Sequence, residues 1–166
     1  MKVMTTSIEG VLLLEPQLFE DERGWFYETW REQDYRQYGI KESFVQDNVS
    51  LSKKNVIRGL HYQQGQGQLV WVSQGHIFDV IVDIRPESPT FNQYVSFDLE
   101  GEKPRQLYMP PGCAHGFCVL SDYAVVHYKC SQYYDPATEG RLAWDDPKIG
   151  IQWPCENPML SQMDDR

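Results

Sequence analysis

Short strand-like runs separated by turn signals fill most of the chain, and this spacing restricts the possible folds more than any other feature. About ten such runs follow one another, each bounded by glycine, proline or polar residues. Two pairs of runs are expected to form antiparallel hairpins: residues 69–73 with 76–85, and residues 116–120 with 124–134. Many short strands at close spacing are typical of an all-β sandwich or barrel. The sequence therefore predicts an all-β fold.

Little regular structure other than strand is expected. The further strand-like segments are residues 10–15, 25–30, 44–52, 56–63, 93–99 and 105–109. Residues 19–24 form a turn-rich loop in this interpretation, and Thr29 to Tyr38 is a short helix that ends at Gly39. Beyond residue 134 we expect a packed, irregular tail.

Length and composition restrict the class of protein. The 166 residues fit a single domain spanning residues 1–166, and the formal net charge of −9 argues against nucleic acid or an anionic membrane as the partner. An anionic small molecule is compatible with this charge if a few arginines gather locally. The four cysteines form no Cys-x-x-Cys pair, which favours free thiols in the cytoplasm over a zinc site or disulfides. No signal peptide or membrane span is expected, because the first apolar run is only residues 11–14.

The segment Val56 to Tyr62 places a cation and an imidazole in a short strand with almost no other charge. Arg58 and His61 are three positions apart, so a regular strand would point them to opposite faces. Gly59 lies between them and permits a bulge, which would turn both side chains towards one cavity. Two interpretations stay open: the floor of a site, or an ordinary strand with an exposed arginine and a hydrogen-bonded core histidine.

Residues 44–52 alternate between a polar and an apolar face. Gln46, Asn48, Ser50 and Ser52 share one face, and valine and leucine side chains occupy most of the other. The polar face either meets bulk water or lines a wet pocket, and the pattern alone favours water.

A second informative motif is Pro110-x-Gly112-x-x-His115, which resembles the second sequence motif of cupin barrels. In those barrels the tight turn delivers the histidine into the barrel mouth. Metal-binding cupins add a first motif with two histidines and a glutamate, whereas the corresponding run here offers only His61. A metal-free site is therefore expected. A purely structural, hydrogen-bonded His115 is the alternative.

The chain as a whole resembles the dTDP-4-dehydrorhamnose 3,5-epimerase family of nucleotide-sugar-modifying cupins. The resemblance extends nearly end to end and rests on the order of many short motifs. These are residues 19–28, 46–50, 58–63, 79–85, 88–91, 111–117, 128–130, 133–134 and 160–161. It implies a cupin-type jelly-roll barrel with a few short helices, a homodimer that exchanges N-terminal strands, and no cofactor. The implied substrate is a nucleoside diphosphate joined to a 4-keto-6-deoxyhexose.

The resemblance also implies residue roles. His61 is the general base, Tyr128 the acid on the opposite face of the sugar, and Asp164 the carboxylate that orients His61. Without the resemblance, Tyr128 would be interpreted as a core aromatic and Asp164 as part of a frayed tail. The positions that hold nucleotide or sugar are Phe19, Arg23, Phe26, Glu28, Gln46, Asn48, Arg58, Gln68, His115 and Tyr134.

These residue types suit the implied chemistry. The hydrogens at C3 and C5 are acidified by the C4 ketone between them, and removing one leaves an enolate that fixed donors must stabilise. Inversion needs a base on one face and a proton donor on the other, which histidine and tyrosine can supply near neutral pH. Arginines are suited to the diphosphate because a guanidinium binds phosphate oxygens in pairs.

One position departs from the family pattern. Gln68 precedes Leu69-Val70 where the family usually has a lysine that helps to stabilise the enolate oxygen, and an amide is a weaker donor than an ammonium. The leading hypothesis is the conversion of dTDP-4-dehydro-6-deoxyglucose to dTDP-4-dehydrorhamnose. The nearest alternative is an enzyme that inverts only C3 or acts on another nucleotide sugar. A non-catalytic sugar-binding cupin and a metal-dependent oxygenase are less consistent with the residues.

Overall fold

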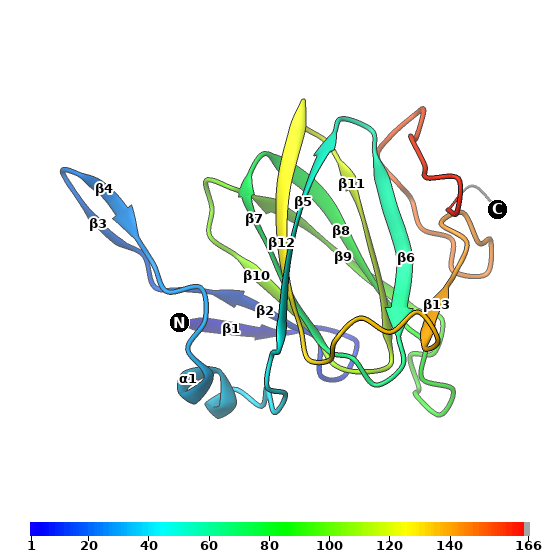
Figure 1. Cartoon of the computed structure of the whole chain (residues 1–166), viewed down its shortest axis with the longest axis horizontal. Coiled ribbons are helices and arrows are strands. Elements are labelled where there is room, and N and C mark those ends of the chain that lie inside the picture. Colours follow the sequence, from blue (N-terminus) through cyan, green and yellow to red (C-terminus); the bar gives the residue numbers. More distant parts are fainter. Residues whose placement is uncertain (165–166) are drawn as a thin grey trace.

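Two antiparallel sheets face each other in the computed structural model, which describes residues 1–164 (Figure 1). The six-stranded sheet has the order β1 (Lys2–Thr5), β2 (Leu12–Glu15), β10 (Gln106–Met109), β7 (Gln68–Gln74), β12 (Tyr123–Cys130), β5 (Gln46–Lys53). The five-stranded sheet has the order β13 (Glu139–Arg141), β6 (Ile57–Gln63), β11 (Cys113–Val119), β8 (His76–Asp83), β9 (Tyr94–Glu100). A hairpin of β3 (Phe19–Asp21) and β4 (Gly24–Phe26) and one helix, α1 (Glu32–Gln37), complete the described elements. The predicted all-β, cupin-type fold is confirmed.

Both predicted hairpins are wrong. β7 pairs with β10 and β12 in one sheet, whereas β8 pairs with β11 and β9 in the other. β11 and β12 are separated in the same way. At each short turn the chain crosses between sheets, and the two crossings pack together: Ser121 Oγ accepts a hydrogen bond from the His76 amide at 2.8 Å. Local alternation is the same in a hairpin and in a crossing, so the pattern does not distinguish them.

Some shorter elements also differ from expectation. The predicted loop at residues 19–24 is the β3–β4 hairpin, and the strand expected over residues 25–30 stops at Phe26. β1 and β13 are strands that the sequence did not predict. The helix is present but covers only the central part of the expected range, and it is the one α-helix within residues 1–164.

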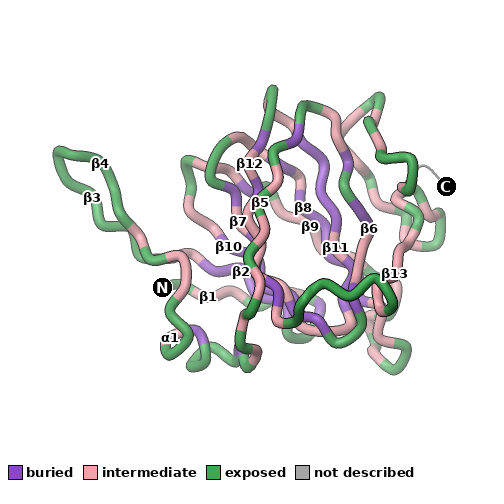
Figure 2. The backbone as a smooth tube through the Cα atoms, viewed as in Figure 1, coloured by how far each residue is buried: buried purple, intermediate pink, exposed green. Residues whose placement is uncertain are grey.

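The hydrophobic core lies between the two sheets, where Figure 2 shows the buried stretches of both. The six-stranded sheet contributes Val70, Val72 and Val126, and the five-stranded sheet contributes Ile81 and Phe117. All five side chains are at most 4% exposed. Dense apolar packing at one end of the space between the sheets leaves the other end for polar side chains.

Each outer face is partly covered by a different segment. On the six-stranded sheet, Tyr35 of α1 and Ile40 pack against Leu14 and Leu69. On the five-stranded sheet, residues from the C-terminal segment, including Trp153, pack against a cluster that contains Val80. The C-terminal segment is therefore held along the outside of the sheet that carries His61.

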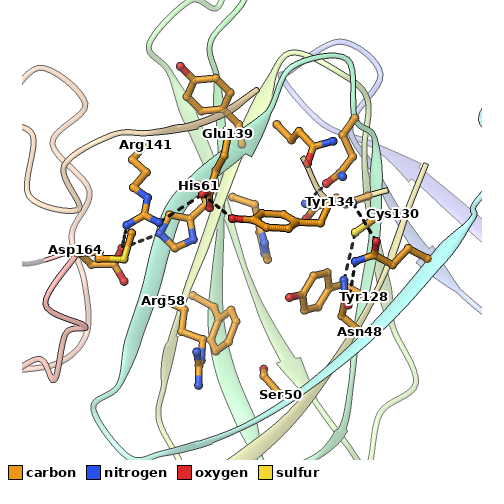
Figure 3. Close-up of a pocket in the computed structure, with 18 of the residues that line it drawn as sticks. Asn48, Ser50, Arg58, His61, Tyr128, Cys130, Tyr134, Glu139, Arg141 and Asp164 are labelled. Carbon is orange, nitrogen blue, oxygen red and sulfur yellow. Dashed lines mark hydrogen bonds and ion pairs between the residues drawn. The ribbon is translucent and has the colours of Figure 1, made fainter. Parts of the chain in front are cut away.

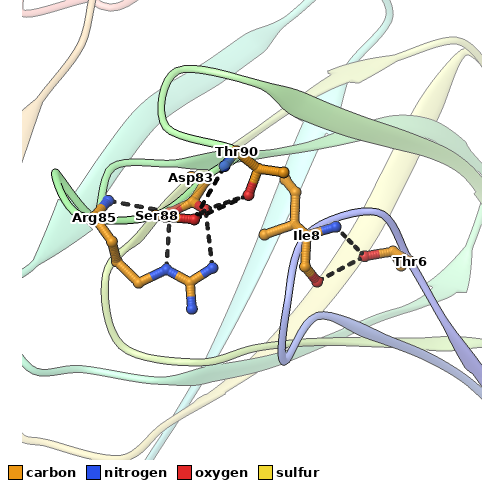
Figure 4. A network of polar contacts seen from close by, with 6 residues as sticks. All are labelled: Thr6, Ile8, Asp83, Arg85, Ser88 and Thr90. Atoms are coloured by element: carbon orange, nitrogen blue, oxygen red, sulfur yellow. Dashed lines mark hydrogen bonds and ion pairs between the residues drawn. The ribbon is translucent and has the colours of Figure 1, made fainter.

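A buried carboxylate organises the turn after β8 (Figure 4). Asp83 is fully buried and accepts hydrogen bonds from Arg85 Nε at 2.8 Å, Ser88 Oγ at 2.5 Å and Thr90 Oγ1 at 2.7 Å. Burial by itself raises the pKa of Asp83, but these hydrogen bonds outweigh it and hold the pKa well below its usual range. The ionised carboxylate thus fixes the loop that leads into β9.

The predicted bulge at Gly59 is present. His61 pairs with His115, but Arg58 pairs with Phe117, so Gly59 and Leu60 together oppose Gly116 alone. Gly59 has a φ of +118°, and a Cβ there would lie 2.5 Å from the His115 carbonyl oxygen and 2.6 Å from the Gly116 Cα. Only glycine fits, because the angle favours it and the opposing backbone occupies the space.

Replacing Gly59 by alanine should destabilise the protein by about 2–4 kcal/mol, since strain in φ and a clash with backbone atoms add. Urea unfolding at fixed protein concentration measures the change. Gly39→Ala is the matched control, because Gly39 has a φ of +90° but nothing within 4 Å of the added Cβ, and it lies outside the β3–β4 hairpin. That variant should lose only about 1 kcal/mol. Equal losses in the two variants would show that the close approach at Gly59 is not what requires glycine.

Candidate active site

A cavity of about 500 Å³ opens between the two sheets, at the polar end of the space that separates them. One wall is formed by β5, β7 and β12 of the six-stranded sheet, and the other by β6, β11 and β13 of the five-stranded sheet. Figure 3 shows side chains from both walls and from the C-terminal segment pointing into it. The cavity brings together nine of the predicted site residues: Gln46, Asn48, Arg58, His61, Gln68, His115, Tyr128, Tyr134 and Asp164.

His61 forms a close pair with Asp164. Its Nε2 lies 2.6 Å from Asp164 Oδ1, although the two residues are 103 positions apart. The Asp164 side chain is only 5% exposed, and its second oxygen accepts a hydrogen bond from Ser161 Oγ at 2.7 Å. A carboxylate on one ring nitrogen fixes the tautomer and leaves the other nitrogen able to accept a proton. Asp164 is thus an ordered part of the site, not a frayed end.

Tyr128 lies on the opposite wall, on β12. It is the cross-strand partner of Asn48 on β5, and both side chains line the cavity. Burial raises the pKa of Tyr128, so the phenol stays protonated at neutral pH and can donate a proton. The neighbouring Cys130 is also buried, which raises the pKa of its thiol to about 11. It is therefore a neutral thiol and not a nucleophile.

The second histidine of the cavity has its own carboxylate. His115 Nε2 lies 2.8 Å from an oxygen of Asp79, and Asp79 is fully buried beneath it. Burial raises the pKa of Asp79, and the adjacent His115 opposes that rise. Because His115 is also the cross-strand partner of His61, the imidazoles of two neighbouring strands lie side by side on one wall.

The polar face of β5 lines the cavity, as the resemblance implied for Gln46 and Asn48, although the alternation alone favoured bulk water. Gln46, Asn48 and Ser50 point inward, and Gln46 Oε1 accepts a hydrogen bond from the Tyr134 amide at 2.9 Å. The apolar side chains are the exposed ones, with Val49 at 62% and Leu51 at 63%. Of the two interpretations of this strand, the wet pocket is the one that the structure shows.

Gln68 lies on the same wall of the cavity as Tyr128, and its side-chain amide already donates one hydrogen bond within the protein. Gln68 Nε2 donates to Gln66 Oε1 at 2.8 Å, and Gln66 in turn donates to the Gln132 carbonyl at 3.1 Å. This relay fixes the orientation of the Gln68 side chain. One N–H of its amide remains for a ligand.

Four predicted ligand-binding residues do not reach the cavity. Phe19, Arg23, Phe26 and Glu28 lie on or next to the β3–β4 hairpin, which projects away from both sheets (Figure 1). Phe19 and Phe26 are 52% and 63% exposed, and Arg23 pairs with Asp21 on the hairpin itself. These residues do not contribute to the cavity of their own chain.

Several cavity residues were not predicted. Phe117 and Cys130 lie two positions after His115 and Tyr128 on the same strands, so strand alternation could have identified them. Glu139 and Arg141 come from β13, which is too short to show an alternating pattern. The other additions are Ser50, Tyr62, Gln63, Gln66, Ser161 and Met163.

Within residues 1–164, no group of three or more His, Cys, Asp or Glu side chains is arranged to hold a metal ion. The four cysteines are free thiols. No helix in this part of the chain is long and apolar enough to cross a membrane.

Comparison with known proteins points to one family. The dTDP-4-dehydrorhamnose 3,5-epimerase family profile matches residues 5–166. The chain is 52% identical to dTDP-4-dehydrorhamnose 3,5-epimerase of Salmonella typhimurium, over 99% of this chain and 92% of that protein. It is 36% identical to dTDP-4-dehydrorhamnose 3-epimerase of Streptomyces niveus, over 99% and 81%.

Among solved structures, it is similar to the epimerase of Legionella pneumophila crystallised with dTDP-4-keto-L-rhamnose. The TM-score is 0.96 and the identity is 48%, over 99% of this chain and 89% of that one.

Proposed function

The chain belongs to the dTDP-4-dehydrorhamnose 3,5-epimerase family, and we propose that it inverts C3 and C5 of dTDP-4-dehydro-6-deoxyglucose to give dTDP-4-dehydrorhamnose. The observation that supports this most strongly is the position of His61 and Tyr128 on opposite walls of one cavity. A hexose ring between them would have a base on one face and a protonated phenol on the other. Such an arrangement is what inversion by proton removal and return requires.

Each inversion proceeds in two proton transfers. His61 takes the hydrogen from the carbon next to the ketone, and the electrons of that C–H bond move to the ketone oxygen to form the enolate. Tyr128 then gives its proton to the same carbon from the other face. The tyrosinate and the imidazolium return to their starting forms by proton exchange with water. Asp164 stabilises the imidazolium in between, because its carboxylate lies 2.6 Å from the ring.

Two variants test these roles. His61→Asn should reduce deuterium exchange at C3 and C5 by roughly two to four powers of ten, the usual contribution of a general base. Tyr128→Phe should reduce net inversion more than exchange, because the base acts first. The measurement is NMR of dTDP-4-dehydro-6-deoxyglucose incubated with each variant in deuterated water.

His76→Asn is the matched control, because His76 also pairs with a carboxylate, Asp98, at 2.8 Å but lies outside the cavity. It should exchange at the unmodified rate. Unmodified exchange in His61→Asn would remove His61 from the role of base.

Gln68 keeps the C3-only alternative open. The enolate oxygen needs a donor, and an amide held by Gln66 offers a weaker hydrogen bond than an ammonium would. Each 1.4 kcal/mol of lost stabilisation of the enolate slows the reaction about tenfold. A single enolate oxygen serves both inversions, so we expect both to be slowed equally and the product to remain the C3,C5-inverted sugar.

Gln68→Lys should therefore raise turnover by roughly ten- to thirty-fold without changing the product. Product NMR against authentic standards and initial rates give both quantities. Gln74→Lys, at the exposed end of the same strand, controls for the added charge. If Gln68→Lys gains exchange at C5 that the parent chain lacks, the parent is a C3 epimerase.

We further propose that two copies form a dimer in which each β3–β4 hairpin completes the cavity of the other copy. Two-stranded hairpins are rarely stable alone in water, and this one exposes Phe19, Trp25 and Phe26. A second apolar surface lies on the outer face of the six-stranded sheet, where Val49 and Leu51 are exposed beside the stacked rings of Trp71 and His127. Apolar surface of this kind favours association.

Complementation between two inactive variants tests the exchanged hairpin. Arg23→Gln removes the proposed diphosphate ligand and His61→Asn removes the base, so neither variant alone should be active. In a coexpressed mixture, half of the dimers are mixed and each has one intact cavity, so about a quarter of the parent activity should return. Absence of recovery, with both variants dimeric by light scattering, would mean that Arg23 does not act in the partner's cavity.

We place the protein in the cytoplasm, where its four free cysteines are stable as thiols. The proposed chemistry uses protein side chains only, without a cofactor.

A further inference from the structure

Arg141 lies against the His61–Asp164 pair of the cavity. It is the cross-strand partner of His61 on the edge strand β13, so the two side chains share a face. Its Nη1 lies 3.9 Å from Asp164 Oδ1, the same oxygen that contacts His61 Nε2 at 2.6 Å. Figure 3 shows the guanidinium beside both.

The guanidinium lies between two carboxylates. Its Nη2 is 3.5 Å from Glu139 Oε2, while Nη1 faces Asp164. Glu139 Oε2 also accepts a hydrogen bond from the Tyr134 hydroxyl at 3.2 Å. Arg141 thus lies between Asp164, the carboxylate paired with His61, and Glu139, the carboxylate that holds Tyr134 at the cavity wall.

The contact to Asp164 acts through charge more than through a hydrogen bond, because 3.9 Å exceeds hydrogen-bond distance. The contact is partly shielded from solvent, since the Asp164 side chain is 5% exposed and the Arg141 side chain 28%. Partly buried charges are screened by water and salt less than exposed ones, so the guanidinium attracts the Asp164 carboxylate at this distance.

We infer that Arg141 is a positioning residue for the base: its guanidinium anchors the Asp164 carboxylate, and through that carboxylate the imidazole of His61, in the geometry that proton transfer needs. This inference rests on the proposed function for the role of His61, but the contacts belong to the substrate-free protein. The side chain acts through Asp164 and needs no contact with the reacting atoms.

Arg141→Gln tests the inference in two ways. In the free protein, the NMR resonances of the His61 ring protons should shift, because the imidazole loses its fixed position against Asp164. In the reaction, kcat should fall roughly ten- to a hundred-fold through misplacement of the carboxylate, while KM changes little. Arg141→Lys should restore part of kcat, because it restores the charge but not the planar group.

Arg105→Gln is the matched control, since it removes the same charge from a residue that pairs with Glu15 outside the cavity. It should leave the His61 ring resonances and kcat unchanged. Unchanged His61 resonances in Arg141→Gln would overturn the inference, and so would a reduced kcat with no rescue by lysine. If the parent protein shows no exchange at all, the proposed function fails, while the His61 resonances still decide the role of Arg141.

Discussion

The backbones of β6 and β11 meet at Gly59 and Gly116 more closely than any Cβ on Gly59 would permit, and the cavity depends on this contact. The extra residue in β6 shifts the register by one, so that Arg58 and His61 both line the space between the sheets. In a regular strand these two side chains would face opposite ways. Only one of the two side chains would then line the cavity. A steric constraint at one glycine therefore determines which charges the cavity contains.

The rest of the site follows from the two-sheet architecture. His61 and His115 are fixed by one sheet and Tyr128 and Gln68 by the other, so a ligand between the sheets has different chemistry on its two sides. The C-terminal segment packs on the outside of the His61 sheet and returns to place Asp164 against the imidazole. β13 brings Arg141 to the same carboxylate. Rigid strands supply the reacting groups, and the surrounding segments hold them in position.

Part of this arrangement could be predicted from the sequence. Gly59 between Arg58 and His61 signals a bulge because only glycine tolerates the geometry, and alternation in residues 46–52 signals a two-faced strand. Alternation does not say which face is inside, so for the polar face of β5 the pattern alone favoured water, and only the resemblance placed Gln46 and Asn48 at the ligand. It also does not say whether a short turn closes a hairpin or crosses between sheets, which is why β7 and β8 were wrongly paired. Glu139 and Arg141 carry no local signal, because their strand is three residues long and their importance comes from contacts with distant residues. The resemblance to the epimerase family supplied Tyr128 and Asp164, which no local pattern would have selected.

The account as a whole depends on the hexose lying between His61 and Tyr128. A crystal structure with dTDP-glucose, which lacks the ketone and therefore does not react, measures this directly. We expect the hexose ring in the cavity between the sheets, with the imidazole of His61 against one face and the hydroxyl of Tyr128 against the other. A hexose that contacts both side chains through the same face, or that lies outside the cavity, would contradict the account.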